Sequence, residues 1–186
     1  MRIIAGSARG IPLMPPPKDM PIRPTLDRVR EALFSILAHR VDGGRFLDLF
    51  AGSGANGIEA LSRGAAEAVF ADADARALKL VRANLEKTRL ERHGVCLRLN
   101  IPQDLRRLNG SFSIIFADPP YAFSGHAALL AGVGEHGLLA PEGILVFEHA
   151  RKTVLPDAVS AFQRYRIALY GDTGLSFYSQ AIASPA

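Results

Sequence analysis

The chain has 186 residues, 48% of them hydrophobic and 22% charged, which is the composition of an ordinary soluble globular protein. Its single cysteine, Cys96, lies in an apolar run. This excludes a disulfide framework and a cysteine-rich metal site, so we expect no metal. No stretch is long and apolar enough to span a bilayer, and the first residues contain no long apolar region. We therefore expect a cytoplasmic protein.

The net charge of +4 is concentrated in the first quarter of the chain. Residues 1–45 hold eight Lys/Arg and four Asp/Glu, whereas residues 46–186 hold fourteen of each. Most of these cations are arginines, whose planar guanidinium binds phosphate as a fork. The distribution favours a polyanionic partner over a merely solvated basic face. We divide the chain into a basic N-terminal arm and helix, residues 1–45, and a main domain, residues 46–186.

The N-terminal part predicts an extended arm followed by a helix. Residues 2–13 form two short extended pieces around a Gly/Ser/Arg turn, and the proline-rich segment 12–24 excludes a helix interior or a central strand. Thr25 then caps a helix with one apolar face. The other face of this helix is expected to present Arg28 and Arg30 to solvent.

From Phe46 onward, strands and helices alternate, which predicts an α/β fold with a mostly parallel sheet covered on both faces. The sequence GDTG near the end is a hairpin signal, so an antiparallel pair is expected to close the sheet. The strands are expected at 46–50, 68–72, 95–100, 112–118, 144–149, 165–170 and 175–179. The helices are expected at 55–63, 74–87, 102–108, 125–136 and about 157–162.

A glycine-rich loop follows the first of these strands. Gly52, Gly54 and Gly57 fit the pattern GxGxxG, which lets a ligand approach bare backbone at a helix N-terminus. Asp72 ends the next strand, where it suits a ribose diol. A nicotinamide cofactor would fit the same pattern. However, Asp48 inside the strand suits an ammonium group better than a pyrophosphate, and no histidine downstream indicates hydride transfer.

A second motif closes the apolar run 112–117. Asp118 supplies two acceptor oxygens, and Pro119 and Pro120 carry no N–H, which keeps carbonyl groups available to a ligand. Tyr121 adds a flat face for stacking. Acceptors beside a ring suit a planar base that bears an exocyclic amine. Taken alone, the tetrapeptide fits a plain strand-to-loop turn equally well.

The loop FAGSG, the strand end at Asp72 and DPPY, in this order, resemble class I S-adenosylmethionine-dependent methyltransferases that act on exocyclic amines. The blocks RIIAGSARG, RPTLDRVREALF and LDLFAGSGANGIEALSRGA are similar to those of the bacterial 16S rRNA guanine-N2 methyltransferase family, often called RsmD. The resemblance implies a Rossmann-like, mostly parallel seven-stranded sheet and S-adenosyl-L-methionine as cofactor. It also implies methylation of the 2-amino group of one guanine in 16S rRNA of the small ribosomal subunit. We expect a monomer.

The resemblance also implies roles for individual residues. Asp72 would bind the ribose hydroxyls of the cofactor, and Asn100 and Ile101 would lie near its adenine. The target base would be held by Asp118, Pro119, Pro120 and Tyr121. The methionine end of the cofactor would face Asp48, Phe50, Ala51, Gly52, Ser53 and Gly54.

Two positions depart from the family pattern. Asn56 stands where leucine is common, and the sequence NIP at 100–102 replaces a more usual acidic or asparagine-containing turn.

The RNA contacts are a separate hypothesis. From the basic first quarter we expect phosphate contacts that position the RNA around the target base. These contacts are assigned to Arg9, Arg23, Arg28 and Arg30.

Three alternatives share parts of this pattern. A DNA adenine or cytosine amino methyltransferase has the same loop and tetrad, but such enzymes usually carry a recognition domain for which 186 residues leave little room. Methylation of a protein amide uses similar tetrads, although asparagine is more typical there than Asp118. A non-catalytic RNA-binding assembly factor would keep the fold without activity, and cofactor binding would distinguish it.

Overall fold

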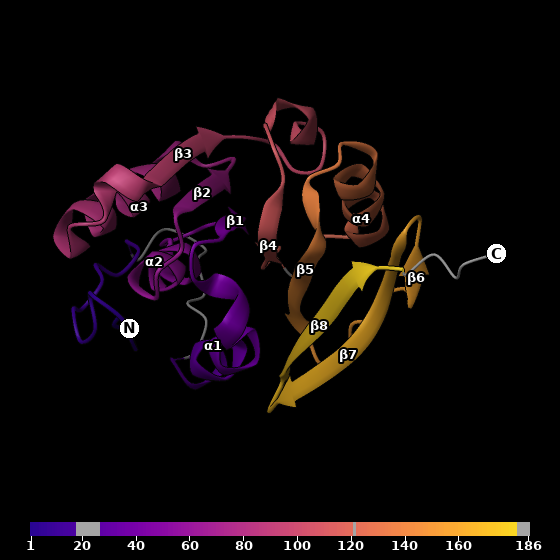
Figure 1. Cartoon of the computed structure of the whole chain (residues 1–186), viewed down its shortest axis with the longest axis horizontal. Helices are drawn as coiled ribbons and strands as arrows, with labels where there is room; N and C mark the ends of the chain where they lie inside the picture. The colour runs from indigo at the N-terminus through magenta and orange to yellow at the C-terminus, as the bar shows by residue number, and fades with distance from the viewer. Residues whose placement is uncertain (18–26, 121, 182–186) are drawn as a thin grey trace.

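The computed structural model describes residues 1–17, 27–120 and 122–181. One mixed sheet runs through the molecule, and helices cover both of its faces (Figure 1). The helices of the described residues are α1 (Asp27–Val41), α2 (Ala55–Ser62), α3 (Ala75–Thr88) and α4 (His126–Glu135), with short 3-10 turns η1 (Glu91–His93) and η2 (Leu105–Arg107). The strands are β1 (Arg45–Leu49), β2 (Glu67–Asp72), β3 (Gly94–Arg98), β4 (Phe112–Ala117), β5 (Leu139–Ala150), β6 (Ala158–Val159), β7 (Phe162–Tyr170) and β8 (Thr173–Gln180).

The strand order β3-β2-β1-β4-β5-β8-β7-β6 confirms the predicted α/β architecture. The first five strands are parallel, because a helix or a long crossover returns the chain between them. β7 and β8 form the predicted antiparallel hairpin, with Tyr170 opposite Thr173 and Gly171 at a φ of 61° in the turn. None of the described helices is long and apolar enough to cross a membrane.

Two helix predictions and the strand count were wrong. The segment predicted as a helix at about 157–162 contains β6, the eighth strand, which pairs with the start of β7. The chain reverses there at Ser160, whose φ of 52° is incompatible with a helix. The predicted helix 102–108 contains only the turn η2. Asp104 explains this, because its carboxylate accepts the Asn100 N–H and its own N–H donates to the Asn100 carbonyl, which closes a local turn.

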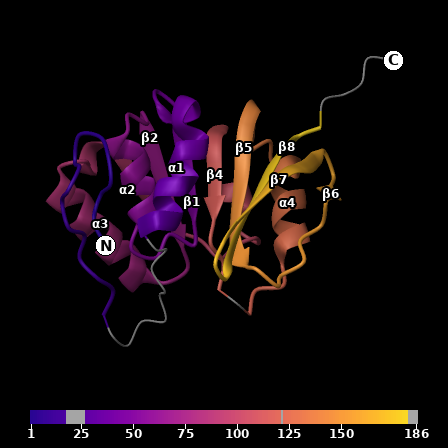
Figure 2. The ribbon, with the colours of Figure 1, turned by 90° about the horizontal axis from the view of Figure 1, so that it is seen from below.

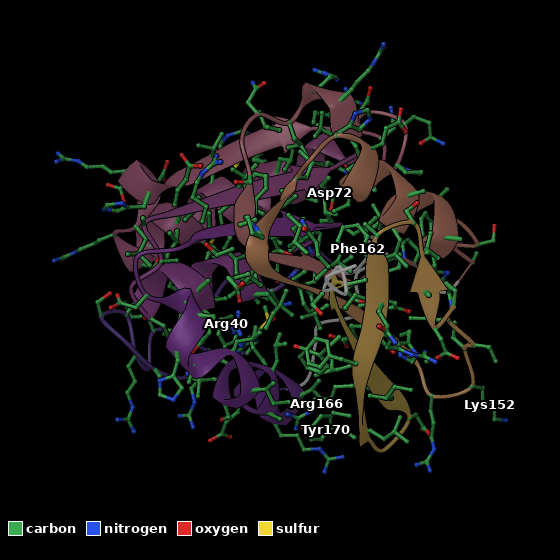
Figure 3. All side chains as sticks on the ribbon, turned by 45° about the vertical axis from the view of Figure 1, so that its right-hand side comes forward. Arg40, Asp72, Lys152, Phe162, Arg166 and Tyr170 are labelled. Carbon is green, nitrogen blue, oxygen red and sulfur yellow. The ribbon has the colours of Figure 1, made fainter. Side chains whose placement is uncertain are left out.

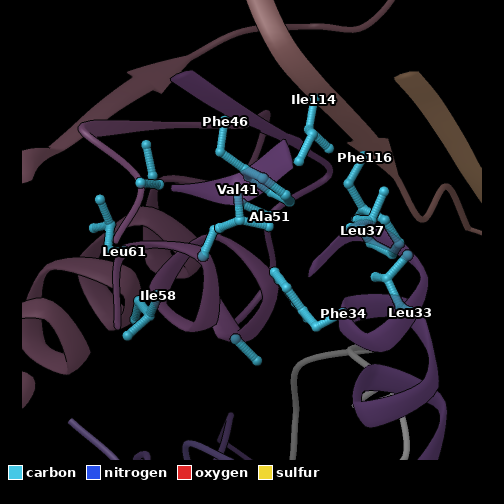
Figure 4. Packing of buried hydrophobic residues seen from close by; sticks show 14 of the residues in the cluster. Leu33, Phe34, Leu37, Val41, Phe46, Ala51, Ile58, Leu61, Ile114 and Phe116 are labelled. Atoms are coloured by element: carbon cyan, nitrogen blue, oxygen red, sulfur yellow. The ribbon is translucent and has the colours of Figure 1, made fainter. Parts of the chain in front are cut away.

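The core lies on both faces of the sheet. Alternate residues of the strands point to opposite sides, so Phe46 of β1 packs with α1, α2 and α3, whereas Leu47 packs with α4. Figure 4 shows the first of these clusters, in which Leu33 and Phe34 of α1 lie against the sheet beside Phe116. The glycine loop therefore emerges from a strand that is packed on both faces.

The N-terminal arm is part of this core. The Ile3 N–H donates to the Ile11 carbonyl (3.0 Å) and the Gly10 N–H to the Ile3 carbonyl (2.8 Å), which confirms two extended pieces around a turn. Ile3, Ala8 and Leu13 are buried with the residues of α1 and α2. The arm runs beside α2 and α3, and β6 and β7 lie on the opposite side of the molecule (Figures 1 and 2).

Glu59 on α2 fixes the arm to the rest of the fold. This fully buried carboxylate accepts the N–H groups of Ile4 (2.8 Å) and Ala5 (3.0 Å). It also pairs with Arg63 (2.7 Å) and with Arg30 of α1 (3.6 Å). A single side chain thus connects the arm, α1 and α2.

The prediction that Arg30 faces solvent was wrong. Its side chain is fully buried, and its guanidinium lies between the Glu59 carboxylate, the Arg2 carbonyl and Asp27. Burial lowers the pKa of Arg30, and the charges of Glu59 and Asp27 oppose this effect. Because no part of the side chain is exposed, Arg30 has a structural role and is not an RNA contact in this conformation.

Replacing Glu59 by glutamine should destabilise the protein, because it leaves the buried charge of Arg30 without its main counter-charge. We expect Glu59→Gln to lower the free energy of unfolding by about 3 kcal/mol. Denaturant titration measures this change. Glu86→Gln, on the exposed side of α3, is the matched control and should stay within about 0.5 kcal/mol of the unsubstituted protein. Equal effects of the two substitutions would contradict the role of Glu59.

Candidate functional site

The predicted cofactor and base-binding residues lie along one edge of the sheet, at the carboxyl ends of parallel strands. Leu49, the last residue of β1, is opposite Ala71 of β2 on one side and Ala117 of β4 on the other. Asp72 and Asp118 therefore flank the glycine loop from the two neighbouring strands. Figure 3 labels Asp72 at this edge. In open α/β sheets this edge is where ligands bind.

The glycines of the loop are required by the backbone and by packing. Gly52 and Gly54 have φ values of 55° and 76°, the left-handed region that glycine adopts without strain. A Cβ at Gly57 would lie 2.3 Å from the Phe70 ring, so only glycine lets α2 pack this closely on β2. The N-terminus of α2 therefore directly follows the loop, where the backbone can be approached by a ligand.

Asp72 holds one end of this loop. One carboxylate oxygen accepts the Gly52 N–H (3.0 Å) and the other accepts the Asp74 N–H (2.9 Å). The side chain is partly exposed, and each carboxylate oxygen can accept a second hydrogen bond. This geometry leaves acceptors for further hydrogen bonds, and the binding of ribose hydroxyls by Asp72 stays a prediction.

Asp48 binds the backbone at the other end of the loop, in the first turn of α2. Its Oδ2 accepts the Gly57 N–H (2.9 Å), and the residue is only 2% exposed. Burial raises the pKa of Asp48 to about 8; the Gly57 hydrogen bond lowers it, and the charge of Asp72 raises it. A cationic group placed near this carboxyl would stabilise its ionised form.

An aromatic contact joins the glycine loop to the segment after Asp118. Phe50 has a φ of 61°, which is unusual for a residue with a Cβ, and its ring lies 5.2 Å from the Phe123 ring in an edge-on arrangement. The Phe123 N–H donates to the Pro120 carbonyl (2.8 Å). Sequence reasoning did not assign Phe123. An aromatic residue two positions after the DPPY motif was the available signal.

The other residues that the sequence assigned to cofactor binding differ in their exposure. Asn100 is exposed, and its N–H is bound by Asp104, whereas Ile101 is partly buried and packs against the same core as Phe50. Ala51 and Ser53 are buried within the loop. Asn56 is also buried, and its Oδ1 has no hydrogen-bond partner among the described residues. Nothing in the structure explains asparagine at this position.

The predicted base-binding and RNA-binding residues are only partly brought together. Asp118 and Pro119 are half-buried, Pro120 is exposed, and Tyr121 lies outside the described residues. Arg9 is exposed in the turn of the arm, and Arg28 is exposed at the start of α1. Arg23 lies outside the described residues. The described part of the chain contains no cluster of three or more His, Cys, Asp or Glu side chains that could hold a metal ion.

Comparison with known proteins gives consistent matches over nearly the whole chain. The family model described as conserved hypothetical protein 95 matches residues 1–179. A Bacillus subtilis protein provisionally named as the rRNA methyltransferase YlbH is 39% identical over 183 residues, which cover 97% of this chain and 99% of that protein. Ribosomal RNA small subunit methyltransferase D of Escherichia coli K12 is 33% identical over 180 residues, 97% of this chain and 90% of that protein. A solved Escherichia coli structure, provisionally described as a methyltransferase, has a TM-score of 0.85 at 32% identity and covers 97% of each chain.

The raised pKa of Asp48 predicts a specific pH dependence of stability. The folded state binds this proton more tightly than the unfolded chain, so the contribution of Asp48 to stability falls as the pH rises from about 4 to about 8. Asp48→Asn removes this dependence. We therefore expect the free energy of unfolding of Asp48→Asn, relative to the unsubstituted protein, to increase over this range.

Denaturant titration at a series of pH values measures the relative stability. Asp172→Asn, at an exposed position in the β7–β8 turn, is the matched control and should shift the curve without changing its shape. A constant difference between Asp48→Asn and the unsubstituted protein would show that Asp48 titrates normally in the fold.

Proposed function

Since the chain belongs to the family described as conserved hypothetical protein 95, we propose that it is an rRNA methyltransferase. In this proposal a methyl group passes from S-adenosyl-L-methionine to the exocyclic 2-amino group of a guanine in 16S rRNA of the small ribosomal subunit. The observation that carries the proposal is the common edge of the sheet shared by the Asp72-bound glycine loop and Asp118. A methyl donor and an acceptor amine could meet there. The names of the relatives support ribosomal RNA as the acceptor.

The residues around the loop fit the proposed cofactor. Left-handed Gly52 and Gly54 leave the backbone at the start of α2 open to a ligand, and Asp72 retains acceptors for the ribose hydroxyls. Ile101 offers an apolar surface to the adenine, and Asp48 offers a carboxyl to the ammonium group at the methionine end. The cofactor would supply an electrophilic methyl group on a sulfonium. We propose that the protein works as a cytoplasmic monomer.

The chemistry of the amine explains why Asp118 and Pro119 would be needed. An aryl amine is a poor nucleophile because its lone pair is delocalised into the ring. The Asp118 carboxylate and the Pro119 carbonyl would accept its two N–H groups and favour a more pyramidal nitrogen. As the nitrogen–carbon bond forms and the carbon–sulfur bond breaks, positive charge develops on the nitrogen, and these acceptors stabilise it. The proton then leaves to Asp118 or to water.

The substrate base must leave its stack to reach Asp118. Sequence-specific RNA readers usually take such bases from loops and bulges, where unstacking costs little. We propose that the exposed Arg9 and Arg28 contact phosphates near the target and that Arg23 assists them, whereas Tyr121 stacks on the base. These phosphate contacts position the RNA. Contacts to the edge of the base determine which base is methylated.

The proposal is tested by mapping the methylated base. The protein is incubated with methyl-labelled S-adenosylmethionine and small ribosomal subunits that lack this methylation, with naked 16S rRNA and with duplex DNA in parallel. We expect label at the N2 position of one guanine in the small-subunit RNA. Label on DNA or on protein would contradict the proposal. Binding of the cofactor without transfer to any of these acceptors would favour a non-catalytic RNA-binding factor.

Asp118→Asn tests the role of the carboxylate while preserving its shape. Because the amide lacks the negative charge that stabilises the developing cation, we expect kcat to fall by about 10²- to 10³-fold. Single-turnover transfer to undermethylated subunits measures this rate. Calorimetric binding of S-adenosylmethionine is the control and should change by less than about twofold. Turnover close to that of the unsubstituted protein would exclude the proposed role of the carboxylate.

A further inference from the structure

A basic surface lies between α1 and the β7–β8 hairpin, and of its residues only Arg28 belongs to the predicted site. It consists of Arg28 and Arg40 of α1 and Tyr165, Arg166 and Tyr170 of β7; we call it the α1–hairpin surface. Figure 3 shows Arg40 on α1 and Arg166 and Tyr170 toward the hairpin on the same side of the molecule. The two elements are far apart in the sequence, so the charge count of the first 45 residues did not reveal this surface.

One end of the surface adjoins the edge of the sheet that carries the site. A Cβ on Gly171 would lie 3.4 Å from Nη2 of Arg28, which places this guanidinium beside the hairpin turn. The turn follows Tyr170, and Thr173 on its other side is opposite Ala150 at the carboxyl end of β5. Because β5 is parallel to β4, this end of the surface lies at the same edge as Asp118.

The other end extends along α1 away from the site. Arg40 Nη1 donates to the carbonyl of Glu142, near the amino end of β5. Positions 28, 32, 36 and 40 are four residues apart and therefore form one ridge that winds slowly around the helix. The twelve steps from Arg28 to Arg40 span about 18 Å at the usual helical rise. This length accommodates several nucleotides of one strand.

The hairpin side is arranged by a β-bulge. The register with β8 shifts between Arg164 and Arg166, which leaves Tyr165 as an extra residue that is 51% exposed. The Arg166 guanidinium lies 5.7 Å from the centre of the Phe177 ring, and the Tyr165 ring lies 6.3 Å from the same ring. Burial raises the pKa of the Tyr165 phenol, and the charges of Arg40 and Arg166 lower it, so both cations are close to it.

The chemistry of the α1–hairpin surface fits a polyphosphate chain. Within the described residues, no carboxylate forms an ion pair with Arg28, Arg40 or Arg166. These three guanidinium groups, next to an exposed phenol ring, provide phosphate forks and a stacking face for a base. An acidic protein would satisfy the charges but would not require the surface to continue to the edge at Asp118.

We propose that the α1–hairpin surface binds the rRNA strand that continues from the target guanine, with Arg40 and Arg166 on phosphates and Tyr165 on a base. This inference rests on the proposed function and extends it from the base to the neighbouring nucleotides. Arg28 connects the α1–hairpin surface with the site that holds the target guanine, since it lies at the end of this surface next to the site.

The experiment compares two double variants that remove the same charge. Arg40→Gln/Arg166→Gln alters the surface, and Lys79→Gln/Lys87→Gln alters exposed positions of α3 as the matched control. Binding to deproteinised 16S rRNA is measured over a range of salt concentrations. For the surface variant we expect roughly tenfold weaker binding, and a slope of log K against log salt that is smaller by about 1.4, or about 0.7 for each lost phosphate contact. The control variant should bind like the unsubstituted protein.

Tyr165→Ala separates stacking from charge. It should weaken binding at every salt concentration and leave the slope unchanged, because no phosphate contact is lost. Calorimetric binding of S-adenosylmethionine to each variant checks that the fold and the cofactor loop are intact.

The outcomes distinguish this inference from the proposed function. If the unsubstituted protein methylates the guanine but the surface and control variants bind the rRNA equally, the α1–hairpin surface is not an RNA-binding surface. If the surface variant loses affinity for ribosomal subunits but not for deproteinised rRNA, its partner is a protein and the proposal fails. If the surface variant loses affinity for rRNA while no methylation is detected, the surface stands and the proposed function is wrong.

Discussion

The candidate site depends on two carboxylates that fix the glycine loop from opposite sides. Asp72 binds the Gly52 N–H at the start of the loop, and the buried Asp48 binds the Gly57 N–H at the first turn of α2. Left-handed glycines provide the turn, but they do not by themselves select one conformation, because glycine is permissive. The carboxylates select it. The loop is therefore already in its turned conformation before a ligand binds, which reduces the entropic cost of binding.

Asp48 and Asp72 together set the electrostatic environment of the loop. Asp48 and Asp72 act on each other as like charges, and burial already disfavours ionisation of Asp48. A ligand with an ammonium group would stabilise the ionised carboxyl, whereas a pyrophosphate would add a further negative charge.

Much of the fold could be predicted from the sequence, because strand and helix periodicity and the glycine loop are local signals. The strands of the parallel half lie within a residue or two of their predicted starts, except that β5 begins earlier at Leu139. Two of the failures are non-local. β6 exists because β7 pairs with it, and Arg30 is buried because Glu59, 29 positions later in the chain, supplies its counter-charge. A polar residue on a helix predicts solvent exposure unless such a partner is known, and the sequence does not reveal the partner.

The distribution of arginines bears on how a small single-domain chain could select its substrate. Within the part of the chain that the structure describes, the proposed RNA contacts lie on elements that also form or cover the sheet. α1 and the β7–β8 hairpin belong to the sheet half opposite α3, and both approach the edge that carries Asp118. Phosphate contacts from these elements would fix the orientation of the strand without reading its sequence. Discrimination would then depend on which base, held in that orientation, can be unstacked and can present two amine hydrogens to Asp118 and Pro119. A partly assembled subunit that exposes such a base would be preferred over a duplex, because unstacking there costs less.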